Sequence, residues 1–132
     1  MATEQEVQEY LDQMRKERGG YIPAPHLYVA PKDLEFLKAY NNLYNSALQD
    51  GKELPIKYRE LVAIAILAYR HRTGAVVNHI RRALQYGATK QEILDAIEST
   101  VIPGGAPCFG TALDAMLQVE EEEAAKAEGG EK

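Results

Sequence analysis

The chain has 132 residues, 45% of them hydrophobic and 27% charged, so it is long enough for one domain with a buried core and has an ordinary globular composition. A formal net charge of -5 at pH 7 makes nucleic acid and anionic membranes poor partners, because both attract positively charged surfaces. No apolar run approaches the roughly 20 residues that cross a bilayer, and the first residues lack the basic and apolar segments of a secretory signal, so we expect a cytoplasmic protein.

The N-terminal part of the chain predicts two helices joined by an extended connector. Apolar residues at helical spacing predict a first helix over residues 3–18. The two prolines of residues 21–26 each push the preceding residue out of the helical region, so this stretch is expected to be a fixed, extended connector. A second helix is predicted from about residue 31 to residue 49, with Asp50 and Gly51 as its stop.

The middle of the chain predicts a helical hairpin. A helix over about residues 57–71 is apolar on every face between residues 61 and 68, which is typical of a helix that is buried all round. Thr73 and Gly74 break it, and another helix is expected over residues 75–86. Because short turns join antiparallel neighbours, we expect these two helices to form the central antiparallel hairpin of the fold.

Two further helices and a tail complete the prediction. Thr89 and Glu92 form a capping box that starts a fifth helix, which runs to the Pro-Gly-Gly break at residues 103–105. A last helix follows from about residue 106 and runs into an acidic segment. Residues 124–132 have too little apolar content to pack, so we expect a disordered acidic tail.

No segment alternates as a strand would. The sequence therefore predicts an all-α fold of about six helices, with a single domain over residues 1–123.

Glu60 and His79 are the two residues of the hairpin best suited to acid–base chemistry. Glu60 precedes an apolar run, where a buried carboxylate must be neutralised, paired or used. It could equally be a surface residue of the first helical turn, since negative charge is favourable at a helix N-terminus. His79 lies on an apolar face, where a lone histidine is more often structural than catalytic. A carboxylate from the neighbouring helix would orient its ring and stabilise the protonated form, which makes the pair a candidate catalytic site.

The segment from Arg59 to Ile93 resembles the carboxymuconolactone decarboxylase and alkyl hydroperoxidase D family. The resemblance rests on the stretch Arg-Glu-Leu-Val-Ala-Ile-Ala at its head and on the block His-x-x-x-Ala-Leu-x-x-Gly-x-Thr that begins at His79. Weaker similarity extends to residues 20–23, 33–40 and 104–107. The resemblance to this family implies an alkyl hydroperoxidase D-like helical bundle that assembles into a homotrimer or homohexamer.

The redox centre of that family is missing from this sequence. In the hydroperoxidase branch a Cys-x-x-Cys-x-x-x-His motif supplies the chemistry, and aligning it on His79 puts its cysteines at Arg72 and Ala75. A disulfide cycle needs an attacking and a resolving thiol, so this site cannot carry one. The single cysteine, Cys108, is expected to be buried and structural.

Glu60 and His79 without cysteines resemble the decarboxylase branch, which acts on a carboxylated unsaturated lactone in aromatic degradation. The resemblance implies no metal or organic cofactor. We therefore expect a carboxy-lyase, or a related isomerase that transfers a proton beside a carbonyl, with a small carboxylate as its substrate. His79, held by Glu60, would deliver the proton.

Arg72, His26 and Cys108 complete the predicted substrate site. Arg72, at the mouth of the hairpin, would bind the substrate carboxylate. His26 lies in the rigid proline connector, and loops on a rigid scaffold often bring polar groups to an active site. Cys108 is predicted to be a further contact of the substrate.

Each of these assignments has an ordinary alternative. Residues 70–72 could be helix C-terminal cations that complement the dipole, and His26 could be an exposed turn histidine. Arg81 and Arg82 flank His79 but are expected on other faces of its helix, where surface or subunit-contact roles suit them. The histidines show no zinc-site spacing, so no metal is expected. The alternative function is a hydroperoxidase-branch protein that has lost its thiols and binds a ligand or acts as an interaction module.

Overall fold

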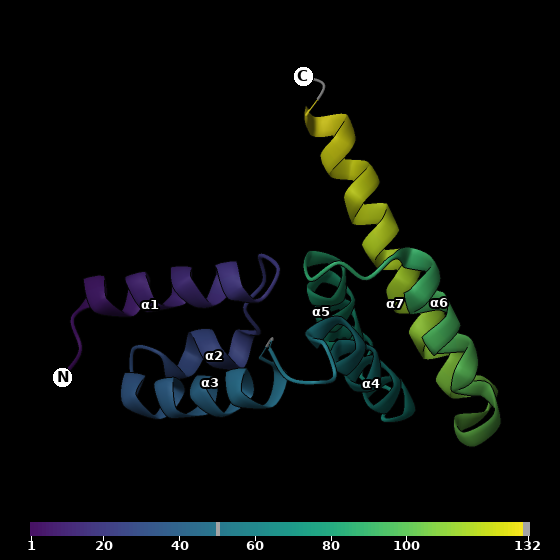
Figure 1. Cartoon of the computed structure of the whole chain (residues 1–132). Coiled ribbons are helices and arrows are strands. Elements are labelled where there is room, and N and C mark those ends of the chain that lie inside the picture. Colours follow the sequence, from purple (N-terminus) through teal and green to yellow (C-terminus); the bar gives the residue numbers. More distant parts are fainter. Residues whose placement is uncertain (50, 131–132) are drawn as a thin grey trace. The chain divides into compact units, whose positions relative to one another are not determined.

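The computed structural model describes residues 1–49 and 51–130, which form seven α-helices and, over those residues, no strand (Figure 1). The predicted all-α class is confirmed, with one helix more than the six or so expected. The helices group into two compact units, Met1–Lys52 and Glu53–Lys132. A single domain over residues 1–123 stays a prediction.

The first unit contains α1 (Glu4–Glu17), α2 (Ala24–Val29) and α3 (Leu34–Leu48). Asp50, predicted as part of the stop after α3, lies outside the described residues. Apolar side chains from α1, from α3 and from the segments on either side of α2 form a small buried core, which consists of Leu11, Met14, Ile22, Ala30 and Leu37.

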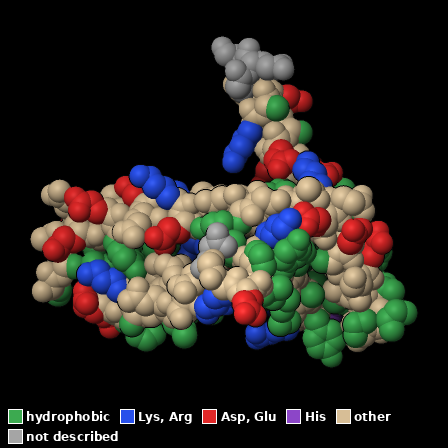
Figure 2. All heavy atoms as spheres, viewed as in Figure 1, with side chains coloured by type: hydrophobic (Ala, Val, Ile, Leu, Met, Phe, Trp, Pro, Cys, Tyr) green, Lys and Arg blue, Asp and Glu red, His purple; other side chains and the backbone are tan. Residues whose placement is uncertain are grey.

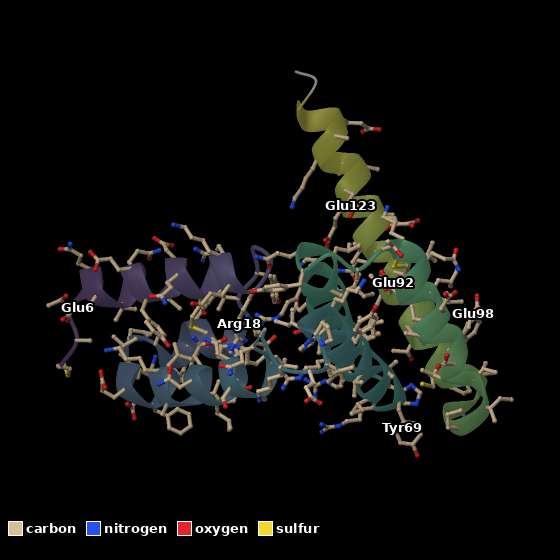
Figure 3. All side chains as sticks on the ribbon, viewed as in Figure 1. Glu6, Arg18, Tyr69, Glu92, Glu98 and Glu123 are labelled. Carbon is tan, nitrogen blue, oxygen red and sulfur yellow. The ribbon has the colours of Figure 1, made fainter. Side chains whose placement is uncertain are left out.

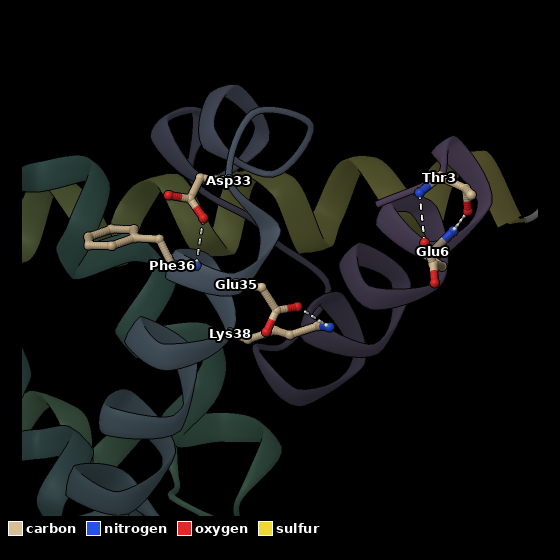
Figure 4. A network of polar contacts seen from close by, with 6 residues as sticks. All are labelled: Thr3, Glu6, Asp33, Glu35, Phe36 and Lys38. Atoms are coloured by element: carbon tan, nitrogen blue, oxygen red, sulfur yellow. Dashed lines mark hydrogen bonds and ion pairs between the residues drawn. The ribbon is translucent and has the colours of Figure 1, made fainter. Parts of the chain in front are cut away.

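Side-chain caps start two helices of this unit (Figure 4). The Glu6 backbone N–H donates to Thr3 Oγ1 at 3.1 Å, and the Thr3 backbone N–H donates to Glu6 Oε2 at 2.7 Å. At α3 the Phe36 backbone N–H donates to Asp33 Oδ1 at 3.0 Å. Helix starts leave backbone donors without helical partners, and these side chains satisfy them.

The proline connector is shorter than predicted, because α2 begins at Ala24, directly after Pro23. Pro25 lies in the first turn of α2, where a missing backbone N–H costs no helical hydrogen bond and the fixed φ of proline suits the helix. The expectation of an extended chain over residues 21–26 was therefore wrong in its second half.

The second unit contains the hairpin, α4 (Ile56–Tyr69) and α5 (Thr73–Gln85), followed by α6 (Lys90–Ser99) and α7 (Val101–Gly130). A short turn reverses the chain, and α5 runs back along α4 (Figure 1). The capping box at the start of α6 is confirmed. All four helices contribute to one buried core, whose largest side chains include Ile64, Ile80, Ile93 and Ile97.

The hairpin turn lies earlier than predicted. Thr73 and Gly74 open α5, and the reversal takes place at residues 70–72. His71 has a left-handed φ of 54°, its N–H donates to the Ala68 carbonyl, and the next N–H donates to the carbonyl of residue 67. This is the Schellman helix ending, which normally places glycine at the left-handed position. The sequence has histidine there, so the glycine signal pointed to the wrong residue.

The predicted break at residues 103–105 is a kink inside α7, where Gly105 has φ 83° and ψ 171°. The helix then continues through Gly130, so the tail is helical from residue 124 to 130, where disorder was expected. Residues 124–129 are exposed, as their polarity predicts. Alanine favours helix, and extending an existing helix needs no new nucleus. Glu131 and Lys132 lie outside the described residues.

One face of α4 is exposed, which differs from the prediction of burial all round. Its buried positions repeat every four residues, whereas Val62, Ile66 and Tyr69 are 52%, 55% and 63% exposed. Figure 2 shows hydrophobic side chains gathered on the surface of this part of the second unit. Among the described residues, no helix combines the length and apolar character needed to cross a bilayer.

Candidate active site

Glu60 belongs to the buried stripe of α4, one turn after Ile56 and one turn before Ile64. Its side chain is 0% exposed. The alternative of a surface glutamate is therefore excluded. A carboxylate removed from water in this way needs counter-charges or hydrogen-bond donors beside it.

His79 lies on α5 and faces Glu60 across the hairpin. Its Nδ1 is 2.5 Å from Glu60 Oε2, and its side chain is 16% exposed. The predicted contact between the two residues is confirmed. Because Nδ1 faces the carboxylate, the orientation of the ring is fixed and Nε2 is the nitrogen that can exchange a proton with a bound molecule.

Arg82 is the third member of this cluster, and its predicted surface role was wrong. Its side chain is 3% exposed, and its Nε lies 2.7 Å from Glu60 Oε1 in an ion pair. Residues three apart on a helix share a face, so the spacing from His79 carried a signal that the expected preference of arginine for the surface obscured. Arg81, by contrast, is 21% exposed and forms an ion pair with Glu122 of α7.

The carboxylate of Glu60 thus divides its oxygens between two cationic or potentially cationic neighbours on α5. Arg82 balances its negative charge, and the imidazole adds either no charge or one positive charge to the cluster. A site of this kind can accept and return a proton next to an anionic molecule without leaving a buried charge uncompensated. Among the described residues, no three His, Cys, Asp or Glu side chains are grouped so that they could hold a metal ion.

The sequence model of the Carboxymuconolactone decarboxylase family matches residues 35–118, which include all three of these side chains. The chain belongs to the carboxymuconolactone decarboxylase family. The uncharacterized protein MJ1511 of Methanocaldococcus jannaschii is 33% identical to it over 100 residues, which cover 75% of this chain and 92% of that protein. The uncharacterized protein H16_B0147 of Cupriavidus necator is 28% identical over 71 residues, or 54% of this chain and 62% of that protein.

Two solved structures have the same fold as this family member. A candidate carboxymuconolactone decarboxylase from Burkholderia xenovorans LB400 superposes with a TM-score of 0.74 at 25% identity, over 94% of this chain and 98% of that one. A carboxymuconolactone decarboxylase family protein from Legionella pneumophila gives a TM-score of 0.62 at 25% identity, over 89% and 90% of the two chains.

Two further predicted residues of this family member, Arg72 and Cys108, also belong to the second unit. Arg72 is exposed and directly precedes α5. Cys108 is 1% exposed, so the expectation of a buried thiol is confirmed. It lines a pocket of about 390 Å³ between α4, α6 and α7, together with Tyr69 and Thr100. The substrate-binding roles of Arg72 and Cys108 stay predictions.

His26 lies in α2 of the first unit, so its expected approach to His79 also stays a prediction. The ring is half-buried, and its centre is 5.2 Å from that of the Tyr40 ring. Burial, followed by the positive charge of Arg18, holds the pKa of His26 below its ordinary value.

Proposed function

We propose that this protein is a cofactor-independent carboxy-lyase that removes carbon dioxide from a small carboxylated lactone or unsaturated keto acid. The observation that supports the proposal is the contact of 2.5 Å between the buried Glu60 carboxylate and His79 Nδ1, which prepares Nε2 for proton transfer. Membership in the carboxymuconolactone decarboxylase family agrees with this chemistry. Fold and family alone do not establish a reaction, so the site carries the argument.

The reaction needs one proton and no redox partner. The bond between the carboxyl carbon and the ring carbon breaks, carbon dioxide leaves, and the electron pair moves into the conjugated carbonyl of the substrate. His79 Nε2–H then delivers its proton to the carbanion, and the ring recovers a proton from water. In the related isomerisation no carbon dioxide is lost: an unprotonated Nε2 removes a proton from the carbon beside the carbonyl, and the same nitrogen returns that proton to a different carbon.

The substrate is an anion, so binding needs a cation besides the acid–base pair. We propose Arg72 for this role, because its exposed guanidinium can form a bidentate contact with a carboxylate. His26 and Cys108 are proposed as further substrate contacts. The reaction would belong to the breakdown of aromatic compounds.

The test is a screen of carboxylated lactones and unsaturated keto acids for release of carbon dioxide. With a substrate in hand, His79→Gln and Glu60→Gln should each lower turnover by on the order of 10²–10⁴. Cys108→Ala removes a proposed substrate contact and no acid–base group, so it should weaken substrate binding, leave the rate of the chemical step largely intact and cost roughly 1–3 kcal/mol in stability. An inactive but folded Cys108→Ala protein, together with an active His79→Gln protein, would show that the Cys108 thiol carries the chemistry in place of His79. No release of carbon dioxide from any compound would favour a ligand-binding role.

We further propose that the protein is a homotrimer or homohexamer. The exposed apolar face of α4 supports association, because symmetric assembly is the common way to cover such a surface. Light scattering at micromolar concentration should give a multiple of the chain mass, and Ile66→Glu should reduce it. A monomer in the wild type would reject the proposal.

A further inference from the structure

Arg82 is a buried cation to which the proposed reaction assigns no step. Its side chain is 3% exposed, its Nε lies 2.7 Å from Glu60 Oε1, and its guanidinium carbon is 5.0 Å from the centre of the Tyr86 ring. Burying both members of an ion pair costs solvation energy, and apolar side chains of similar size often serve stability as well or better. The pair therefore calls for an explanation other than packing.

We propose that Arg82 is a positioning residue that supplies the counter-charge of Glu60, so that the His79 ring is neutral in the empty site and gains a proton when an anionic substrate binds. The inference deepens the proposed function and rests on it for the identity of the substrate. The charge state of the empty site, however, does not depend on any turnover.

The first step of the argument is the balance of charge in the empty site. A buried carboxylate needs about one positive charge close by. Glu60 has two candidates on α5, since Oε1 lies against Arg82 and Oε2 lies against His79. Arginine is always protonated in proteins, so it completes the balance by itself. The imidazole can then be neutral, with its proton on Nδ1 and donated to Oε2, and Nε2 can be an acceptor.

The second step concerns the occupied site. A substrate carboxylate adds one negative charge, and the ring can take up one proton from water to balance it. That proton is the one the reaction consumes, since a carboxylate and a proton give the decarboxylated product and carbon dioxide. After the proton reaches carbon, the ring is neutral again. Without Arg82, the imidazole would itself have to be the permanent counter-ion of Glu60, and the empty site could not take up this proton.

The test reads the protonation of the His79 ring nitrogens in the full-length protein, without substrate, by 15N NMR. The chain has three histidines, so His79→Gln identifies the ring of interest. At about pH 7.5, above the ordinary histidine value of roughly 6.5, the wild type should show one protonated nitrogen, Nδ1, and one unprotonated nitrogen, Nε2. Arg82→Met should lose the unprotonated resonance, because both nitrogens then carry protons.

Matched variants separate the charge of Arg82 from its packing. Arg82→Lys keeps the charge and should keep the wild-type pattern. Arg81→Met, which changes the adjacent and partly exposed arginine, should keep it as well. If Arg82→Met does not fold, the double variant Glu60→Gln/Arg82→Met removes both charges and should again show a neutral ring. A fully protonated ring in the wild type, or in this double variant, would overturn the proposal, as would a neutral ring in Arg82→Met.

The result of the NMR measurement does not depend on the result of the screen for carbon dioxide release. The ring pattern can match the inference even when no lactone is turned over, which would reject the lyase alone. Conversely, the inference alone would be rejected if carbon dioxide is released and the protonation of the His79 ring is the same with and without Arg82.

Discussion

Among the described residues each unit buries an arginine, and the two arginines have partners of different kinds. Arg18 in the first unit, labelled in Figure 3, is 7% exposed. Its contacts include Asn41 Oδ1 at 2.9 Å and the face of the Tyr44 ring at 3.7 Å. Arg82 in the second unit lies against the ionisable carboxyl group of Glu60. The guanidinium of Arg82 and this carboxylate together form a neutral pair, whereas the positive charge of Arg18 acts on a nearby histidine.

The effect of the first arrangement is visible on a neighbouring histidine. Burial and then Arg18 lower the pKa of His26, so the first unit disfavours a second positive charge. In the second unit the charges of Glu60 and Arg82 cancel beside His79. The comparison teaches that the effect of a buried arginine on a nearby histidine depends on the charge of the groups beside that arginine.

The largest expected difference between the two arginines is in stability. Arg82→Met should lower the free energy of unfolding by about 3–5 kcal/mol, because it leaves Glu60 as a buried charge without its arginine. Arg18→Met should cost about 1–3 kcal/mol through Asn41 Oδ1, which loses its donor at 2.9 Å. Urea unfolding at neutral pH, followed by circular dichroism, measures both losses.

Two controls sharpen this comparison. Arg81→Met removes a partly exposed ion pair and should cost less than about 1 kcal/mol. The double variant Glu60→Leu/Arg82→Met should recover most of the loss caused by Arg82→Met, since no charge is left in the core. Equal losses for Arg18→Met and Arg82→Met would show that the partner does not matter.

A smaller effect on stability is expected at the capping boxes, of which each unit has one. Thr89→Ala should lower the free energy of unfolding by about 1 kcal/mol, because the Glu92 backbone N–H loses its acceptor at 3.0 Å. Thr3→Ala should cost less, since the exposed first turn of α1 can fray by itself. Thermal unfolding measures both, with Thr89→Ser as the control that keeps the cap. A larger loss for Thr3→Ala would contradict the expectation.

The smallest expected effect is on the pH dependence of the free energy of unfolding, to which His26 contributes because burial and Arg18 lower its pKa. The pKa of His26 is lowered in the folded protein, so the unfolded chain binds more protons below about pH 6.5. The contribution of His26 to stability is therefore complete above that pH and is lost as the pH falls through the lowered pKa. His26→Gln should flatten the slope of stability below about pH 6.5. An unchanged slope in urea unfolding would reject the assignment.

Local signals in the sequence predicted much of the fold. The capping box of Thr89 and Glu92 begins a helix as expected, because its partners are three residues apart and need no tertiary context. The contact between Glu60 and His79 was also predictable, since a buried carboxylate and an inward histidine on adjacent helices have few other partners. Where a rule has an exception, as with Pro25 in the first turn of α2, the prediction failed.

The other errors concern context that one sequence does not contain. The burial of Arg82 depends on a carboxylate supplied by another helix, and arginine alone favours the surface. The exposed face of α4 was predicted to be buried, because an apolar pattern indicates only that contact with water is unfavourable and not whether the same chain covers that face. Such features need the tertiary structure.

The turn at residues 70–72 fixes more than the reversal of the chain. Its length sets the rotational phase of α5 relative to α4, and each residue added to a helix turns the following side chains by about 100°. His71, held in its left-handed conformation and by a contact of 3.0 Å between its Nδ1 and Thr111 Oγ1 of α7, keeps that length and phase constant. A one-residue insertion here would rotate His79 and Arg82 away from Glu60 together while leaving the apolar composition of the hairpin intact. Loop length, which usually varies freely among relatives, is at this turn a chemical constraint.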